Sequence, residues 1–130
     1  MTEFTLARLA DDATCLAPDG SEVRVLLSLR GGGLAHFRLP AGRTSRAVVH
    51  RTVDEIWYVV AGRGEIWRKF GDRSETTTLE PGVCLTLPVG THFQFRSVGD
   101  TALEILGATM PPWPGDDEAV SADGPWPPNV

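Results

Sequence analysis

The chain has 130 residues, about the length of one domain, and its 42% hydrophobic and 22% charged residues are typical of a globular protein. Its 12 basic and 17 acidic residues give a formal net charge of −5, which repels nucleic-acid phosphates and anionic lipid surfaces. No apolar run approaches the ~20 residues that cross a bilayer, and the first residues lack a basic segment followed by an apolar one. We therefore expect one cytoplasmic domain over residues 1–130, with neither nucleic acid nor membrane as a partner.

The elements expected along the chain are short strands. The opening run 4–13 fits either a helix or a strand. After it, runs rich in β-branched and aromatic residues recur at strand length, and 14 Gly and 10 Pro supply the turns between them. About eight to ten such strands must enclose a core as a sandwich or a barrel, because one sheet that wide would leave apolar faces and open edges exposed. The expected strands are 23–29, 34–39, 55–60, 64–70, 76–82, 83–88, 92–98 and 102–109.

The composition changes at Pro111. Segment 111–130 holds six prolines and two tryptophans and no run typical of a strand. Proline fixes an extended path that needs no ladder partner, so we expect a Pro/Trp-rich C-terminal arm that lies on a barrel of about residues 20–110. Trp113 and Trp126 are its expected anchors, since a solvated tail has little use for tryptophan. The alternative is a disordered tail.

The two cysteines are Cys15 and Cys84, and they form no Cys-x-x-Cys pair of the kind found in redox centres and zinc sites. Free cysteine often behaves as a small buried hydrophobe. Because Cys84 lies between apolar neighbours in the run GVCLTLP, we expect its side chain to be buried.

Two segments of the chain resemble the two conserved motifs of the cupin superfamily. In the first, GRTSRAVVHRTVDEIWYVVAG, the motif's spacing is kept throughout, but valine replaces the first of its two histidines. In the second, GVCLTLPVGTHFQFRS, the glycines and the proline fall in place, whereas the histidine and asparagine do not. The matching positions are Gly42, Val48, His50, Glu55 and Gly62, followed by Gly82, Pro88 and Gly90.

This resemblance implies an all-β fold, the cupin double-stranded β-helix or jelly-roll barrel. Specifically, the chain is similar to the small single-domain, conserved-barrel cupins of the cupin 2 type. Homodimers are common in that family, so a homodimer is expected.

The resemblance also implies a divalent metal inside the barrel. In the family the ligands are the two histidines and the glutamate of the first motif and the histidine of the second. His50 and Glu55 carry over directly, while Val48 cannot ligate a metal. Without a gap, Phe93 takes the second-motif histidine position and His92 points outward, because alternate residues on a strand face opposite sides. With a turn one residue shorter, His92 and Gln94 face inward instead.

The shorter turn would give a metal set of His50, Glu55 and His92, which suits Fe, Mn or Zn. The alternative is a metal-free barrel in which His50 and Glu55 contact each other or a ligand. Glu55 is also the expected catalytic acid or base. The expected cavity wall, which suits an apolar or planar small molecule, consists of Val48, Trp57, Phe93, Gln94 and Phe95.

His36 lies in neither motif, and we expect it to be an ordinary wall or surface residue. Most of Arg46, Arg51, Arg63 and Arg68 should be solvated or paired, although one near the barrel mouth could orient an anionic substrate.

Two classes of function follow for the chain. One is a metal-dependent isomerase, dioxygenase or cyclase acting on a small molecule. The other is a metal-free module that binds or senses a small molecule without catalysis. The fold cannot decide between them, because cupins host unrelated activities on one scaffold.

Overall fold

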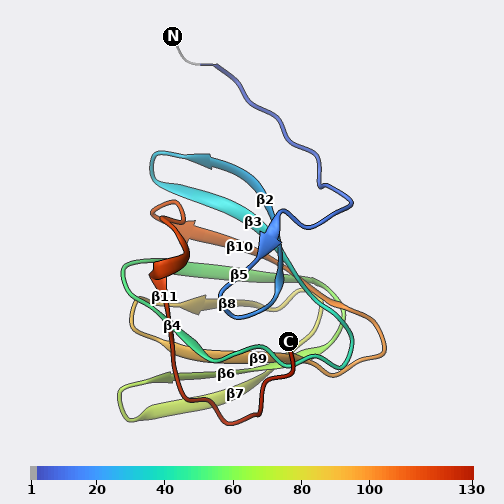
Figure 1. The fold of residues 1–130 in the computed structure, drawn as a ribbon, viewed down its shortest axis with the longest axis vertical. Helices are drawn as coiled ribbons and strands as arrows, with labels where there is room; N and C mark the ends of the chain where they lie inside the picture. The colour runs from blue at the N-terminus through green and yellow to red at the C-terminus, as the bar shows by residue number, and fades with distance from the viewer. Residues whose placement is uncertain (1–2) are drawn as a thin grey trace.

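The computed structural model describes residues 3–130, which form eleven β-strands and one short 3-10 helix, η1 (Asp116–Glu118). No α-helix occurs in this range, so the all-β prediction is confirmed. The strands form two antiparallel sheets that face each other across the core (Figure 1). None of the helical structure in residues 3–130 is long and apolar enough to cross a membrane.

The first sheet has six strands. Its spatial order is β1 (Cys15–Leu16), β2 (Glu22–Leu29), β3 (Gly32–Leu39), β10 (Leu103–Met110), β5 (Asp54–Ala61) and β8 (Cys84–Leu87). The second sheet has five strands, in the order β11 (Ala119–Ser121), β4 (Val48–His50), β9 (His92–Ser97), β6 (Gly64–Phe70) and β7 (Arg73–Leu79).

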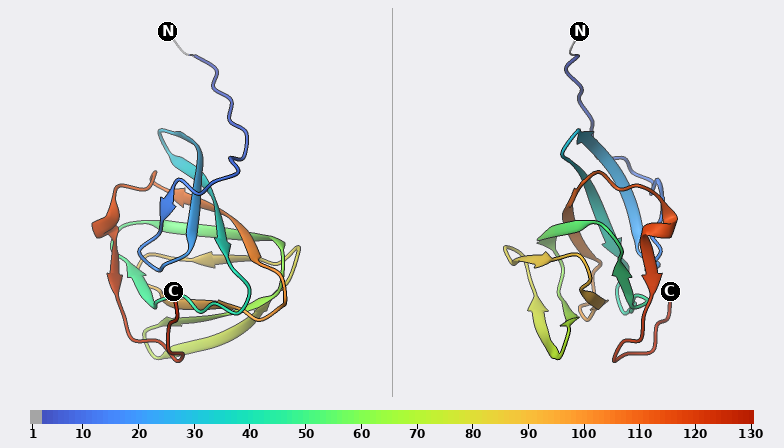
Figure 2. Two further views of the ribbon diagram at one scale, coloured as in Figure 1. Left: turned by 45° about the vertical axis from the view of Figure 1, so that its right-hand side comes forward. Right: turned by 90° about the vertical axis from the view of Figure 1, so that its left-hand side faces the viewer.

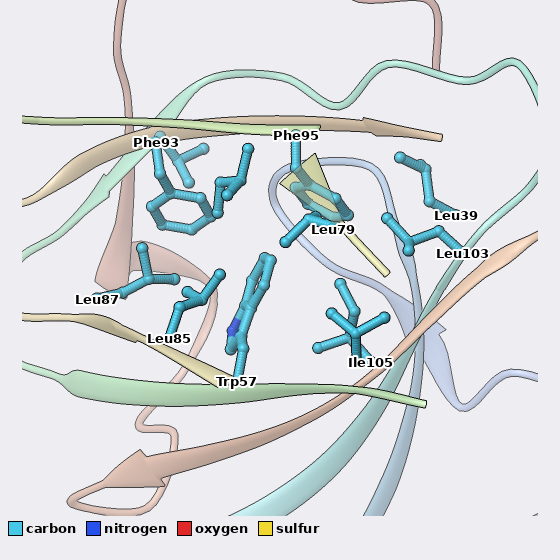
Figure 3. Packing of buried hydrophobic residues seen from close by; sticks show 12 residues of the cluster. Leu39, Trp57, Leu79, Leu85, Leu87, Phe93, Phe95, Leu103 and Ile105 are labelled. Atoms are coloured by element: carbon cyan, nitrogen blue, oxygen red, sulfur yellow. The ribbon is translucent and has the colours of Figure 1, made fainter. Parts of the chain in front are cut away.

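Strand β5 shows how the sequence places its side chains. Glu55, Trp57 and Val59 are buried, whereas Ile56 and Tyr58 between them are exposed, as the period of two along a strand requires. The Trp57 indole reaches across the interior to the phenylalanines of the opposite sheet (Figure 3). The buried apolar side chains of both sheets form one core, which includes Leu39, Leu79, Leu85, Leu87, Phe93, Phe95, Leu103 and Ile105.

The glycine at the end of the first motif closes the turn between β5 and β6. Gly62 has φ of 83°, and a Cβ at that position would overlap the carbonyl oxygen of Ala102. Both observations exclude a side chain there, because only glycine adopts positive φ without steric cost. The motif glycine is therefore a requirement of the backbone path.

The C-terminal arm lies along the five-stranded sheet, and Figure 2 shows it in red beside β4. Part of it forms β11, which pairs antiparallel with β4, although we expected no strand there. Farther along, the Trp126 backbone exchanges hydrogen bonds with the Gln94 side chain, and its ring lies 4.1 Å from the Arg96 guanidinium carbon. Trp113, by contrast, lies over His50, with ring centroids 5.0 Å apart.

Other expectations differ from the structure. The opening run is neither helix nor strand over residues 4–13, and it extends away from the barrel (Figure 1). The side chain of Cys84 is exposed, not buried, because Leu85 and Leu87 take the inward positions of β8. Strand β7 begins at Arg73, since the chain turns within only Gly71 and Asp72.

Candidate functional site

A cavity of about 270 Å³ lies at one end of the barrel, between the two sheets. Its inner wall is formed by buried side chains of both sheets, which are Val23, Val48, His50, Glu55, Trp57, Phe93 and Thr109. Its mouth is marked by lining residues that remain exposed, namely Leu16, Val25, Leu27, Leu34 and Trp113. The wall is mostly apolar, with a few polar groups deep inside, as in most small-molecule sites.

Glu55 is the central polar group of the cavity. It is 3% exposed, and its Oε1 accepts a 2.6 Å hydrogen bond from Nε1–H of Trp57, two residues along the same face of β5. Burial is the main cause that raises the pKa of Glu55 to about 8; the Trp57 hydrogen bond opposes the rise, and nearby Asp19 adds to it. The carboxyl group is therefore mostly protonated at neutral pH.

His50 faces Glu55 from the opposite sheet. Its Nδ1 lies 3.4 Å from Oε2 of Glu55, and its ring is held edge-on between Phe93 and Trp113. Burial lowers the pKa of His50, although the charge of Glu118 opposes this shift. A protonated carboxyl group can donate a proton, and a neutral imidazole can accept one. The pair can therefore hydrogen-bond a ligand or transfer a proton.

Asp19 is a second buried carboxyl group on the cavity wall, in the loop between β1 and β2. Burial raises its pKa, whereas hydrogen bonds from the backbone and hydroxyl of Ser21 and the charge of Arg46 oppose the rise. No motif or period in the sequence indicates Asp19. It reaches the cavity because the loop folds over the barrel end.

Gly107 of β10 makes room for the site. A Cβ at this position would overlap the ring of Phe37 and lie 3.0 Å from Oε1 of Glu55. Its partner on β5 is Trp57, whereas the partner of Glu55 is Thr109, so Gly107 lies one inward-facing position along β10 from the residue opposite Glu55. Both Gly107 and Phe37 were missed in the sequence, although alternation along β3 could have identified Phe37 as inward-facing.

The structure favours the alignment without a gap in the second motif. Phe93 is buried and pairs with Val48 of β4, so both side chains line the cavity. His92, which precedes Phe93 on β9, lies on the opposite face of the strand, where its neighbours are Val49 and Lys69. It is not part of the cavity wall. The structure thus brings His50 and Glu55 together but does not bring His92 to them.

Two further residues expected on the cavity wall lie elsewhere. Gln94 shares the outward face of β9 with His92, and its side-chain amide bonds Ser45 and Trp126. Phe95 faces inward, but it packs against Trp57 in the apolar core, with ring centroids 5.0 Å apart. Neither Gln94 nor Phe95 is among the residues that line the cavity, because the register of β9 turns Gln94 outward and Phe95 packs deeper in the core.

The remaining donors do not fit a metal ion. At the four positions where cupins carry ligands, this chain has Val48, His50, Glu55 and Phe93, so two of the four groups are apolar. Oε1 of Glu55 is occupied by the Trp57 indole. Within residues 3–130, no three His, Cys, Asp or Glu side chains are grouped closely enough to hold a metal. Two donors fall short of the three protein ligands that open metal sites use.

Residues outside the motifs behave largely as expected. His36 is on the face of β3 opposite Phe37, buried, with Nε2 3.0 Å from Oε1 of Glu104. Three arginines form ion pairs away from the cavity, which are Arg51–Asp117, Arg63–Glu80 and Arg68–Glu75.

The fold and the cavity together define a β-barrel protein with an internal cavity between its two sheets. Comparison with known families then gives its membership: the chain belongs to the cupin family, because residues 35–108 match the model of the cupin domain. Among curated proteins, the uncharacterized protein MJ1618 of Methanocaldococcus jannaschii is 27% identical over 110 residues, which cover 81% of this chain and 85% of that protein.

Solved structures agree on the fold. An RmlC-like cupin with a double-stranded β-helix from the same organism has a TM-score of 0.63 at 15% identity, over 85% of this chain and 93% of that one. Oxalate decarboxylase of Bacillus subtilis has a TM-score of 0.68 at 16% identity, over 79% of this chain but 28% of that one. At these identities the similarity shows the fold alone.

Proposed function

We propose that this cupin binds a small, largely apolar molecule in its barrel cavity without a metal ion, and that Glu55 and His50 supply the polar contacts. The observation that carries this proposal is that Val48 and Phe93 occupy two of the four positions where cupins carry metal ligands. Both side chains are apolar, so this part of the barrel forms a largely apolar pocket. The metal-dependent isomerase, dioxygenase or cyclase has less support, since His92 lies on the other face of β9.

The size and lining of the cavity support the proposal. A space of about 270 Å³ accommodates a ligand with one ring and a short substituent. Removing such a ligand from water is favourable because the wall consists mainly of aromatic and aliphatic groups. The polar pair of Glu55 and His50 would then fix the orientation of the ligand, since both groups are buried and have few other partners.

Binding can be tested by an NMR titration of the full chain with benzyl alcohol, a small aromatic molecule with one polar group. We expect saturable shifts at amides around the cavity. Ala35→Phe, which fills the cavity from β3, should abolish them. The matched control is Ala108→Phe, which places the same ring on the opposite face of β10 from Gly107. Absence of saturable binding in the wild type would contradict the proposal.

The metal-free part is tested by elemental analysis of protein purified without a histidine tag. We expect substoichiometric metal in the wild type and in both His50→Ala and His92→Ala. For benzyl alcohol, His50→Ala should weaken binding and His92→Ala should not, because only His50 lines the cavity. Stoichiometric metal in the wild type that is lost in His50→Ala would overturn the metal-free proposal and restore the metal-dependent one.

A further inference from the structure

The ionisable groups that line the cavity include three carboxyl groups and no Lys or Arg. Its lining includes the carboxyl groups of Asp19, Glu55 and Asp116 together with the imidazole of His50, but no Lys or Arg. Asp19 and Glu55 are deeply buried, while Asp116 belongs to η1 and is exposed.

Arg46, whose charge acts on the cavity residue Asp19, does not itself line the cavity. Arg46 acts on Asp19 through its charge, but its guanidinium nitrogens lie 3.5 Å from the carbonyl oxygens of Pro18 and Val130. Among the described residues, no Lys or Arg lines the wall. An arginine that would orient an anionic ligand at the mouth, which the sequence left open, is therefore not found there.

Aromatic rings surround the same space. Phe37, Trp57, Phe93 and Trp113 contribute to the wall. Phe37 and Trp57 lie 5.8 Å apart between centroids, and Trp57 and Phe93 lie 5.6 Å apart in an edge-to-face arrangement. Aromatic faces carry negative electrostatic potential and attract ammonium groups within about 6 Å, most strongly when water is excluded.

We propose that the ligand of this cavity is an organic cation, a primary ammonium group on a small apolar body, whose charge pairs with the carboxyl group of Glu55 between aromatic rings. This inference rests on the proposed function and adds the class of ligand to it. The cavity combines a buried carboxyl group, a second one from Asp19 and four aromatic rings, which together provide a complementary environment for a cation and none for an anion.

The pKa shifts of the carboxyl groups in the cavity agree with a cationic ligand. Burial favours the protonated form of Glu55, whose pKa is about 8, so without a cation this carboxyl group avoids a buried negative charge. Burial also raises the pKa of Asp19. A bound ammonium group supplies the missing positive charge, so Glu55 releases its proton when the cation enters. The other titratable groups that line this space are Cys15 on β1, His50 on β4 and Asp116 on η1. A bound carboxylate would instead face these acids without a counter-ion.

Three probes of similar size and shape isolate the effect of ligand charge on affinity. Benzylammonium, benzyl alcohol and benzoate share one ring and differ in charge at pH 7. Titrations of the full chain, followed by tryptophan fluorescence, should show benzylammonium binding at least tenfold more tightly than benzyl alcohol, a factor equivalent to about 1.4 kcal/mol. Benzoate should show no saturable binding.

A substitution assigns the preference to Glu55. Glu55→Gln keeps the acceptor for the Trp57 indole but cannot ionise, so the affinity for benzylammonium should fall about tenfold, to that of the alcohol. The affinity for benzyl alcohol should fall less than that for benzylammonium, because the amide can still hydrogen-bond a hydroxyl group but cannot pair with a positive charge. Glu65→Gln, which alters a surface partner of Arg96, should affect neither probe. Calorimetry in two buffers of different ionisation enthalpy, neither containing an amine, should show proton release on benzylammonium binding to the wild type and none in Glu55→Gln.

The outcomes separate this inference from the function on which it rests. Equal affinities for benzylammonium and benzyl alcohol, or tighter binding of benzoate, would overturn the cation proposal and leave small-molecule binding intact. A preference for benzylammonium that persists in Glu55→Gln would also overturn it, because the selectivity would then come from another group. If none of the three probes binds, the cation proposal and the proposed function both fail.

Discussion

The Trp57 indole nitrogen donates a 2.6 Å hydrogen bond to the Glu55 carboxyl group, and the two residues are neighbours on the inward face of one strand. The indole is itself held by Phe93 and Phe95 of the opposite sheet, so the apolar core determines the direction of the donor (Figure 3). The polar group of the cavity is thus oriented by the packing of the barrel, which is a preorganised arrangement for ligand binding.

Replacing Trp57 with phenylalanine should destabilise the fold and change the titration of Glu55. The substitution removes a buried donor and part of a large ring, so we expect a loss on the order of 2–4 kcal/mol in the free energy of unfolding. Because the Trp57 hydrogen bond lowers the pKa of Glu55, its removal should raise that pKa further. Urea denaturation and a carbon-13 NMR titration of the Glu55 carboxyl group measure the two effects.

Trp67→Phe is the matched control. Trp67 is half-buried on β6, and its neighbours Ile66 and Arg68 take the inward positions, so it does not contact the cavity. If this control shifts the Glu55 titration as much as Trp57→Phe does, the effect comes from general loosening of the barrel and not from the hydrogen bond.

Between pH 6.5 and 8, stability should fall as pH rises. The pKa of Glu55 is about 8 in the folded protein against an ordinary value of 4.5 in the unfolded chain, so in this window the unfolded chain binds fewer protons than the folded one. The free energy of unfolding therefore decreases by up to about 1.4 kcal/mol per pH unit. The lowered pKa of His50 has the opposite effect: below the ordinary imidazole value of 6.5 the unfolded chain binds a proton that the folded chain does not, so stability there falls as pH falls.

Glu55→Gln isolates this effect, because the amide does not titrate. Urea denaturation at several pH values should show a flatter profile for the variant than for the wild type above pH 6.5. Glu65→Gln should retain the wild-type slope, since that carboxyl group lies on the surface beside Arg96. Parallel profiles for the wild type and Glu55→Gln would show that Glu55 is ionised in the folded protein.

Much of the fold could be predicted from the sequence because it depends on local features. Period-two patterns such as that of β5 identify the inward side chains directly, and both Glu55 and Trp57 lie on the inward face of that strand. The short strands β1 and β4 were missed, since two or three residues are too few to show a period.

The site was less predictable, for two physical reasons. The orientation of His92 and Phe93 depends on one residue of turn length, and a shift of one residue turns every side chain of a strand to the other face. The pairing of Phe93 with Val48 in the structure decides which of the two side chains faces the cavity. Asp19 reaches the cavity from a loop and Trp113 from the C-terminal arm. Contacts between segments far apart in the sequence produce no periodic pattern, so they could not be predicted from it.

Gly107→Ala should disturb the site through the backbone of β10. The added methyl group would overlap the Phe37 ring and lie 3.0 Å from Oε1 of Glu55, so one of the two side chains must move. We expect a loss of about 1–3 kcal/mol in unfolding free energy and weaker binding of benzyl alcohol. Gly31→Ala is the control, because a Cβ there meets nothing within 4 Å. If both variants behave alike, the loss reflects glycine substitution in general and not crowding at the site.

Gln94→Leu should release the end of the C-terminal arm without affecting the cavity. The buried amide donates 2.8 Å hydrogen bonds to the carbonyl oxygens of Ser45 and Trp126, and it accepts one from the Trp126 backbone at 3.1 Å. Leucine leaves these backbone groups unpaired, which should cost on the order of 1–3 kcal/mol and speed hydrogen exchange at the Trp126 amide. Benzyl alcohol binding should be unchanged, as in the control His92→Ala on the same face of β9. Loss of binding in Gln94→Leu with normal exchange at Trp126 would mean that Gln94 faces the ligand, because a residue that only fixes the arm would produce the reverse pattern.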